Sequence, residues 1–173
     1  FSTVYPRTIP FPFDGFATAN GGGAADVAQL MRGLIARQVN GPWVQAQPRR
    51  LQNRVDAVLV QSWKALLPSG KLVAPMEPSV GNLYRWLEQT HSEDPQRTLL
   101  TSYRAVLAPP YGLNAASAGL LLSLLLGLDY PPRRIEQAEG LVGSAEWLGQ
   151  AFPSQKGKHH LDEDVLAVSR LRF

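Results

Sequence analysis

The sequence predicts a mainly α, multi-helix globular domain around one central apolar helix, and it leaves room for a small winged-helix-like β element. Three observations support this fold class. Residues 115–128 are rich in leucine and contain no charged side chain. Apolar residues recur at helical spacing in several other stretches. Hydrophobic residues make up 45% of the chain and charged residues 18%, which is ordinary for a folded core and low for a disordered chain.

Residues 1–20 are predicted to form an extended arm, and residues 21–173 the helical domain. Pro6, Pro10 and Pro12 disfavour a helix, and the aromatic side chains among them suit packing on a neighbouring surface. Three glycines at residues 21–23 then precede an apolar helical stripe. A P-loop at this point would need a Lys and a Ser or Thr that the sequence lacks. We therefore interpret the glycines as a turn before a helix.

The next helices are separated by proline and glycine. Asn40-Gly41-Pro42 ends the first helix, and Pro48 opens a longer one, whose apolar stripe runs as far as Leu67. Residues 71–74 fit a short strand. Ser79 is the expected N-cap of the helix that follows it.

A rigid corner is predicted between two helices in the middle of the chain. Asp94-Pro95 opens the first of these helices, because Asp can cap and Pro suits the first helical position. At the corner, two prolines end the helix and a glycine can take a positive φ. The corner consists of Pro109, Pro110, Tyr111 and Gly112.

The apolar helix follows the corner, with Asn114 as its expected N-cap. A helix that is apolar on every side lies in a protein core or in lipid. A membrane span needs roughly 20 apolar residues, so we expect residues 115–128 in a core, and no membrane.

The last part of the chain leaves alternatives open. Residues 134–138 fit a short strand followed by a helix from Ser144, and they also fit one broken helix. Residues 161–168 fit a final helix or strand.

The sequence contains no complete catalytic, cofactor or metal-binding motif, so no residue is assigned to catalysis, a cofactor or a metal. Cysteine is absent, which removes a thiol nucleophile and is compatible with a cytoplasmic protein. The adjacent His159 and His160 do not share a helix face and would not chelate as an i,i+4 pair does. No Gly-x-Ser-x-Gly elbow occurs.

The chain is mildly basic, with a formal net charge of +3, well below a strong nucleic-acid footprint. If its basic side chains converge, they would contact phosphates and position a nucleic acid; if they are scattered, they form a solvated surface. The candidate nucleic-acid contacts are Arg97, Arg104, Arg133 and Arg134.

Residues 107–127, LAPPYGLNAASAGLLLSLLLG, resemble a segment of very large bacterial ATPases of phage-defence islands, including the BREX type. In that family a "PPYG-L" corner precedes an apolar helix in a winged-helix-like accessory region. YPRTIPFPFDGF and LQNRVDAVLVQSW are also similar to parts of such proteins. The resemblance implies an accessory module of a defence or DNA-handling machine, with a structural role for the corner. Because Walker A is missing, no ATP-binding residue is carried over.

Three functions follow as hypotheses. The first is a non-catalytic interaction or regulatory module of a larger multidomain protein, which contacts other domains of that protein or a partner protein. A start at Phe1 rather than Met fits this expectation of a piece of a longer chain. The second is a nucleic-acid-binding module, and the third is an enzyme with an unrecognised site. A deep pocket with several perturbed acidic or His side chains would indicate the third.

Overall fold

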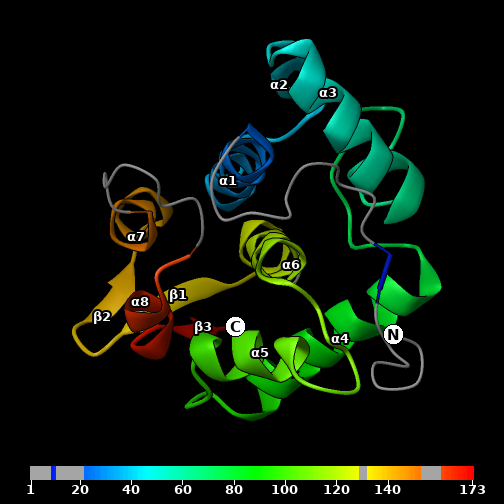
Figure 1. The fold of residues 1–173 in the computed structure, drawn as a ribbon. Coiled ribbons are helices and arrows are strands. Elements are labelled where there is room, and N and C mark those ends of the chain that lie inside the picture. The colour runs from blue at the N-terminus through cyan, green and yellow to red at the C-terminus, as the bar shows by residue number, and fades with distance from the viewer. Residues whose placement is uncertain (1–8, 11–21, 129–131, 153–160) are drawn as a thin grey trace.

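The computed structural model describes residues 9–10, 22–128, 132–152 and 161–173. The described chain is mainly helical and carries one small three-stranded sheet (Figure 1). The elements are α1 (Gly22–Ile35), α2 (Gly41–Gln45), α3 (Arg49–Val55), the π-helix η1 (Asp56–Ser62), α4 (Pro78–Glu93), α5 (Leu99–Leu107), α6 (Ala115–Gly127), β1 (Arg134–Gln137), β2 (Gly140–Val142), α7 (Ser144–Ala151), α8 (Glu163–Ala167) and β3 (Arg170–Arg172).

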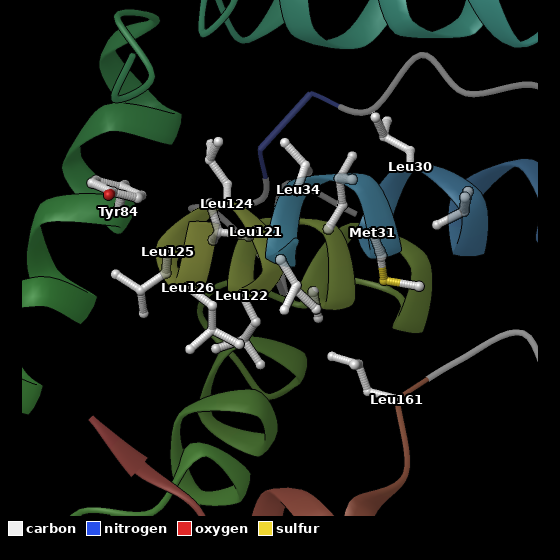
Figure 2. Close-up of a cluster of buried hydrophobic side chains, with 14 of the residues drawn as sticks. Leu30, Met31, Leu34, Tyr84, Leu121, Leu122, Leu124, Leu125, Leu126 and Leu161 are labelled. Atoms are coloured by element: carbon white, nitrogen blue, oxygen red, sulfur yellow. The ribbon is translucent and has the colours of Figure 1, made fainter. Parts of the chain in front are cut away.

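The apolar helix α6 lies at the centre of the fold, as the sequence predicts. Every residue from Ser117 to Gly127 is buried. α1 packs along α6, and α4 and α5 contact it as well (Figure 1). Figure 2 shows side chains of α1, α4 and α6 gathered in one cluster with Leu161. Burial of each leucine stabilises the fold by about 1.5–3 kcal/mol relative to exposure, so the packing around α6 is a major source of stability.

α1 and α6 approach closely because two positions of α6 carry glycine. A Cβ atom built at Gly119 would lie 2.8 Å from the sulfur of Met31. One built at Gly127 would collide with the backbone carbonyl oxygen of Leu34. A flexible thioether can give way, whereas a helix backbone cannot easily do so. Gly127 is therefore the position at which the spacing between the two helices is most tightly set.

Side-chain caps fix where α6 and α4 begin. Asn114 caps α6 as predicted, and its Oδ1 accepts the Ser117 N–H at 2.8 Å. For α4 the cap is Glu77 rather than Ser79, because the Glu77 carboxylate accepts the Val80 N–H at 2.8 Å. The hydroxyl of Ser79 donates to the same carboxylate.

The prediction that Asp94-Pro95 opens the helix before the corner is wrong. α5 begins at Leu99, and its N-cap is Thr98, whose hydroxyl accepts the Thr101 N–H at 3.2 Å. Asp94 instead ends α4, and its Oδ1 accepts the Gln96 N–H in the turn between the two helices. The Asp94 side chain is therefore bonded within the turn and does not cap α5.

The long amphipathic helix that was predicted to reach Leu67 ends earlier and changes its geometry. α3 continues directly into η1, where the turns widen. The Trp63 N–H bonds the carbonyl of Val58, five residues earlier, at 2.7 Å. Lys64 then takes a φ of 54°, and the helix stops. Trp63 is fully buried, so the predicted apolar stripe is correct up to that residue.

The sheet has the order β2-β1-β3 with both pairings antiparallel. This confirms the alternative of a strand followed by a helix from residue 144. Ile135 of β1 pairs with Val142 of β2 and Leu171 of β3. The far edge of β3 meets the chain just before α5 in a bridge between Arg170 and Thr98. A small sheet after a set of helices fits the predicted winged-helix-like element.

Two other predicted strands have mixed outcomes. The stretch 71–74 contributes only an isolated bridge between Leu66 and Leu72. The stretch 161–168, which fits a helix or a strand from the sequence, forms the helix α8, and the strand β3 follows beyond it.

Of the predicted N-terminal arm, the structure describes Ile9 and Pro10. Ile9 is buried, and the carbonyl of Pro10 accepts a hydrogen bond from Trp63 Nε1 at 2.7 Å. These two residues therefore contact the core near the end of η1. The other residues of the arm lie outside the described residues.

Substitution of Gly127 by Ala is expected to destabilise the protein by about 1–3 kcal/mol, because the added Cβ forces α1 and α6 apart. Urea unfolding measures this change. At Gly149, in the exposed part of α7, an added Cβ would have no atom within 4 Å, so Gly149→Ala is the matched control. That control is expected to stabilise by about 0.5–1 kcal/mol. A neutral or stabilising effect of Gly127→Ala would contradict the close approach.

Candidate interaction surface

An aromatic pair lies on the surface where α4 meets the corner between α5 and α6. Trp86 of α4 keeps 36% of its area exposed, and its ring centroid lies 5.9 Å from that of Tyr111, with the planes tilted by 38°. Such a tilted arrangement is favourable for two aromatic rings. Single exposed apolar residues are normal on a protein surface, but a paired Trp and Tyr form a local apolar platform.

Arg97 joins this platform. Its guanidinium carbon lies 5.5 Å from the centroid of the Trp86 ring, within the range of a cation–π contact. Its Nε donates to the hydroxyl of Ser102 at 2.9 Å. Arg97 is a predicted nucleic-acid contact and Tyr111 belongs to the predicted structural corner, and the structure brings both to Trp86. We name Trp86, Arg97 and Tyr111 the aromatic surface.

The corner holds Tyr111 in place through backbone hydrogen bonds. The Tyr111 and Gly112 N–H groups both donate to the carbonyl of Ala108, at 3.1 and 3.0 Å. Gly112 has a φ of 62°, as the sequence predicts for this position, and the peptide bond between Pro109 and Pro110 is cis. The backbone hydrogen bonds fix the position from which the Tyr111 side chain reaches α4.

Sequence reasoning missed Trp86, although a signal was present. The apolar stripe of α4 contains Val80, Leu83, Tyr84 and Leu87, which are all buried. Trp86 does not share the helical spacing of these residues, and its position in the helix places it on the polar side. A tryptophan on the polar side of an amphipathic helix indicates a candidate contact residue.

A serine–histidine pair lies beneath the aromatic surface. Ser102 Oγ lies 2.7 Å from His91 Nε2. The Ser102 hydroxyl accepts from Arg97 Nε, and it still has a proton and a second lone pair for His91 Nε2, so the donor in this bond is set by the tautomer of His91. Burial is the main reason that the pKa of His91 is lowered to about 4; the nearby Arg97 adds to this, and Asp94 opposes it.

This pair has the contact distance of a nucleophile and its base, but it is sealed from solvent. Ser102 is 0% exposed and His91 1% exposed. A substrate therefore cannot reach the hydroxyl in this fold. The pair instead links α4 to α5, and His91 Nδ1 is a buried atom without a described hydrogen-bond partner.

Arg133, a predicted nucleic-acid contact, has its side chain inside the fold. It is 1% exposed, and it forms an ion pair with Glu88 at 2.7 Å. It also donates to the Tyr84 hydroxyl at 3.3 Å and to the Leu125 carbonyl at 3.0 Å. The Leu125 carbonyl belongs to the last turn of α6, where a cation is favourable. Arg133 thus ties α4 to the end of α6, and it does not lie on a surface.

The other predicted arginines have separate neighbours. Arg104 and Glu163 form an exposed ion pair at 3.5 Å, a type that contributes little to stability. Arg134 is exposed on β1, opposite Arg172 of β3. The four arginines therefore have different neighbours and do not form one cluster. Their binding to nucleic acid stays a prediction.

Within the described residues, no group of three or more His, Cys, Asp or Glu side chains is placed to hold a metal ion. His159 and His160 lie outside the described residues. Among the described helices, none is long and apolar enough to cross a membrane.

No family model, no curated protein and no solved structure matches the chain. The resemblance of residues 107–127 to phage-defence ATPases therefore stays a prediction.

The buried His91 predicts a pH dependence of stability. In the unfolded chain its pKa returns to about 6.5, so the unfolded state takes up a proton at a higher pH than the folded state. Above about pH 6.5 His91 is neutral in both states and does not lower the free energy of unfolding. As the pH falls toward 4, protonation of His91 in the unfolded state lowers the free energy of unfolding, by about 3 kcal/mol in total. Urea unfolding at a series of pH values measures this slope.

His91→Gln is the control for this experiment, because glutamine is polar but does not titrate. The carboxylates titrate in both proteins, so only the difference between the two slopes reports on His91. Equal slopes between pH 6.5 and pH 4 would contradict the assignment of this loss to His91.

Proposed function

We propose that this chain is a non-catalytic interaction or regulatory module of a larger multidomain protein. The aromatic surface is its contact site, and the contacted group is another domain of the same protein or a partner protein. The observation that carries the proposal is the exposed Trp86, paired with Tyr111 and touched by Arg97.

The chemistry of this surface supports an interface. Trp, Tyr and Arg are the residue types that most often dominate binding energy at protein interfaces. Trp86 and Tyr111 offer large, stiff apolar areas, and their neighbours hold them in place before a partner arrives. The hydrogen bond from Arg97 to Ser102 fixes the guanidinium beside the ring, so little side-chain entropy is lost on binding.

The arrangement of reactive side chains supports a non-catalytic role. Ser102 and His91, which have the contact distance of a catalytic pair, are enclosed between α4 and α5. The ionised side chains of Asp26 and Arg133 are each held by opposite charges within the fold. These particular groups hold helices together and are not open to a substrate.

The resemblance of residues 107–127 supports a more specific form of the proposal. In this form the parent protein is a large ATP-dependent machine for DNA handling or phage defence, and the present chain is an accessory module. The nucleotide chemistry would then be carried by a different part of that protein.

Site-specific photo-crosslinking tests the contact site. The photoreactive residue p-benzoylphenylalanine at position 86, in the full-length protein in its own cells, is expected to give a discrete crosslinked product. Asn82 is exposed on the same helix, and the same residue at position 82 is the control. Equal products from both positions, or none from position 86, would contradict the proposal.

Trp86→Ala is expected to weaken binding of the crosslinked partner by about 2 kcal/mol or more, the size of an interface hot spot. Because most of the ring is covered by its neighbours, the variant also loses some stability, so binding is measured where urea unfolding shows both proteins to be folded. Binding is measured by calorimetry with the purified partner. Turnover of ATP by the isolated chain, above that of a denatured sample, would refute a non-catalytic role.

A nucleic-acid-binding module is the second candidate, and the contact of Arg97 with Trp86 favours it. Aromatic rings beside arginine are used to stack the bases of single strands. This candidate predicts that a labelled single-stranded oligonucleotide binds at low salt and dissociates as salt rises. Arg97→Gln and Arg104→Gln should weaken binding, whereas Arg49→Gln should not. Absence of binding at low salt, measured by fluorescence anisotropy, would end this candidate.

A further inference from the structure

The outer face of the small sheet carries two arginines directly opposite each other (Figure 1). Arg134 of β1 and Arg172 of β3 are Cα partners in the register of these two strands. The next residues along the strands, Ile135 and Leu171, are buried, and successive side chains of a strand point to opposite faces. Side chains paired in this way have Cβ atoms about 4.5–5.5 Å apart. The two cations are therefore neighbours on the solvent side of the sheet.

The positive charge on this face is only partly balanced. Arg134 is exposed, and its side chain has no hydrogen-bond or ion-pair partner within the described part of the chain. Arg172 is 56% exposed, and its ion pair with Glu136 spans 3.7 Å, which is beyond hydrogen-bond distance. The same carboxylate lies 3.7 Å from Nη2 of Arg170. One carboxylate is thus shared by two guanidinium groups, and Arg134 is left without a counter-charge among the described residues.

The pair of Arg134 and Arg172 is a liability for the fold on its own. Like charges directly opposite each other on a sheet are destabilising. A feature that breaks a local rule of stability without a compensating contact is expected at a functional site. Guanidinium groups bond carboxylates through parallel N–H donors. An incoming carboxylate would therefore bond these donors and remove the repulsion between the two cations.

An apolar residue and a hollow lie beside this pair. Leu141 of the edge strand β2 is 62% exposed, and it shares the outer face because it pairs with Glu136. Arg134 and Leu141 both line a hollow of about 240 Å³. Gly143 lies in the same wall, and a Cβ atom built there would have no atom within 4 Å. The hollow is smaller than the usual range of small-molecule sites, so a single apolar side chain suits it better.

We propose that the outer face of the sheet docks an acidic segment of a partner protein. A carboxylate of the segment lies between Arg134 and Arg172, and an adjacent apolar side chain lies beside Leu141 in the hollow. Charge complementarity selects the acidic partner. A nucleic-acid backbone would match the arginines as well, but it supplies no apolar side chain for the hollow. The proposal goes beyond the contact at the aromatic surface and stands if that contact fails, because the two surfaces share no residue.

A synthetic peptide tests the proposal by NMR with the isotope-labelled chain of 173 residues. The probe is acetyl-Glu-Asp-Glu-Leu-Asp-Glu-amide. It is expected to shift the amide signals of β1, β2 and β3 saturably, and added salt is expected to weaken its binding. One control peptide has Gln and Asn in place of the acids, and the other has Ala in place of Leu. Each control is expected to bind at least about fivefold more weakly. Equal binding of either control, or no saturable shift in the sheet, would overturn the proposal.

A deoxythymidine oligonucleotide with the same net charge as the probe distinguishes the two kinds of anionic partner. It lacks the apolar side chain, so it is expected to bind more weakly than the probe at the same salt concentration. Binding at the same amide signals that is as tight as that of the probe, or tighter, would overturn the assignment to an acidic protein segment.

Two variants locate the probe on the sheet. Arg134→Gln and Arg172→Gln are each expected to weaken its binding about fivefold, the upper value for an exposed ion pair. Arg49→Gln, which removes an exposed arginine outside the sheet, is the matched control. Arg134→Gln is also expected to keep or raise the midpoint of urea unfolding, because it relieves the repulsion between like charges. Unchanged affinity in either sheet variant, an equal loss in the control, or a lower midpoint in Arg134→Gln would overturn the proposal.

Discussion

The fold depends on the fact that α6 has no polar face. A helix of this kind cannot lie on a surface in water, because each exposed leucine would forgo about 1.5–3 kcal/mol of burial. The other elements cover it from different sides: α1 lies along it, while α4 and α5 pack against it (Figure 1). Gly119 and Gly127 follow from the same demand, since Gly127 lets the α1 backbone come close and Gly119 leaves room for the Met31 side chain.

Enclosing α6 also explains why polar groups are found inside the protein. The helix ends in a buried region, so its last carbonyl groups need partners. Arg133 reaches the Leu125 carbonyl, and Glu88 balances its charge. Asn114 serves the other end. The Ser102 hydroxyl similarly forms hydrogen bonds with both Arg97 and His91. The buried side chains of Ser102 and Arg133 are thus held by partners inside the fold.

Local signals allowed the central helix and its Asn114 cap to be predicted from the sequence, and they gave the strand after residue 133 as one of two alternatives. Predictions failed where two local signals competed, as at Asp94, which ends α4 instead of opening α5. The role of Arg133 depends on Glu88 and Leu125, which are remote or buried, and no spacing rule could reveal it. Trp86 could have been recognised as a candidate contact residue from its place on the polar side of α4. Its contacts with Tyr111 and Arg97 could not, because they depend on how the corner folds.

The burial of α6 also restricts how a nucleic acid could be bound. In helix-turn-helix proteins the second helix of the pair enters the major groove, and α5 and α6 are the helix pair that precedes the β1–β2 hairpin. α6 cannot act in this way, because its residues from Ser117 onward are covered by other helices. Freeing it would expose its leucines and the apolar faces that cover them. A winged-helix-like order of elements is therefore compatible with phosphate or base contacts at the outer surface, but α6 itself cannot read a groove.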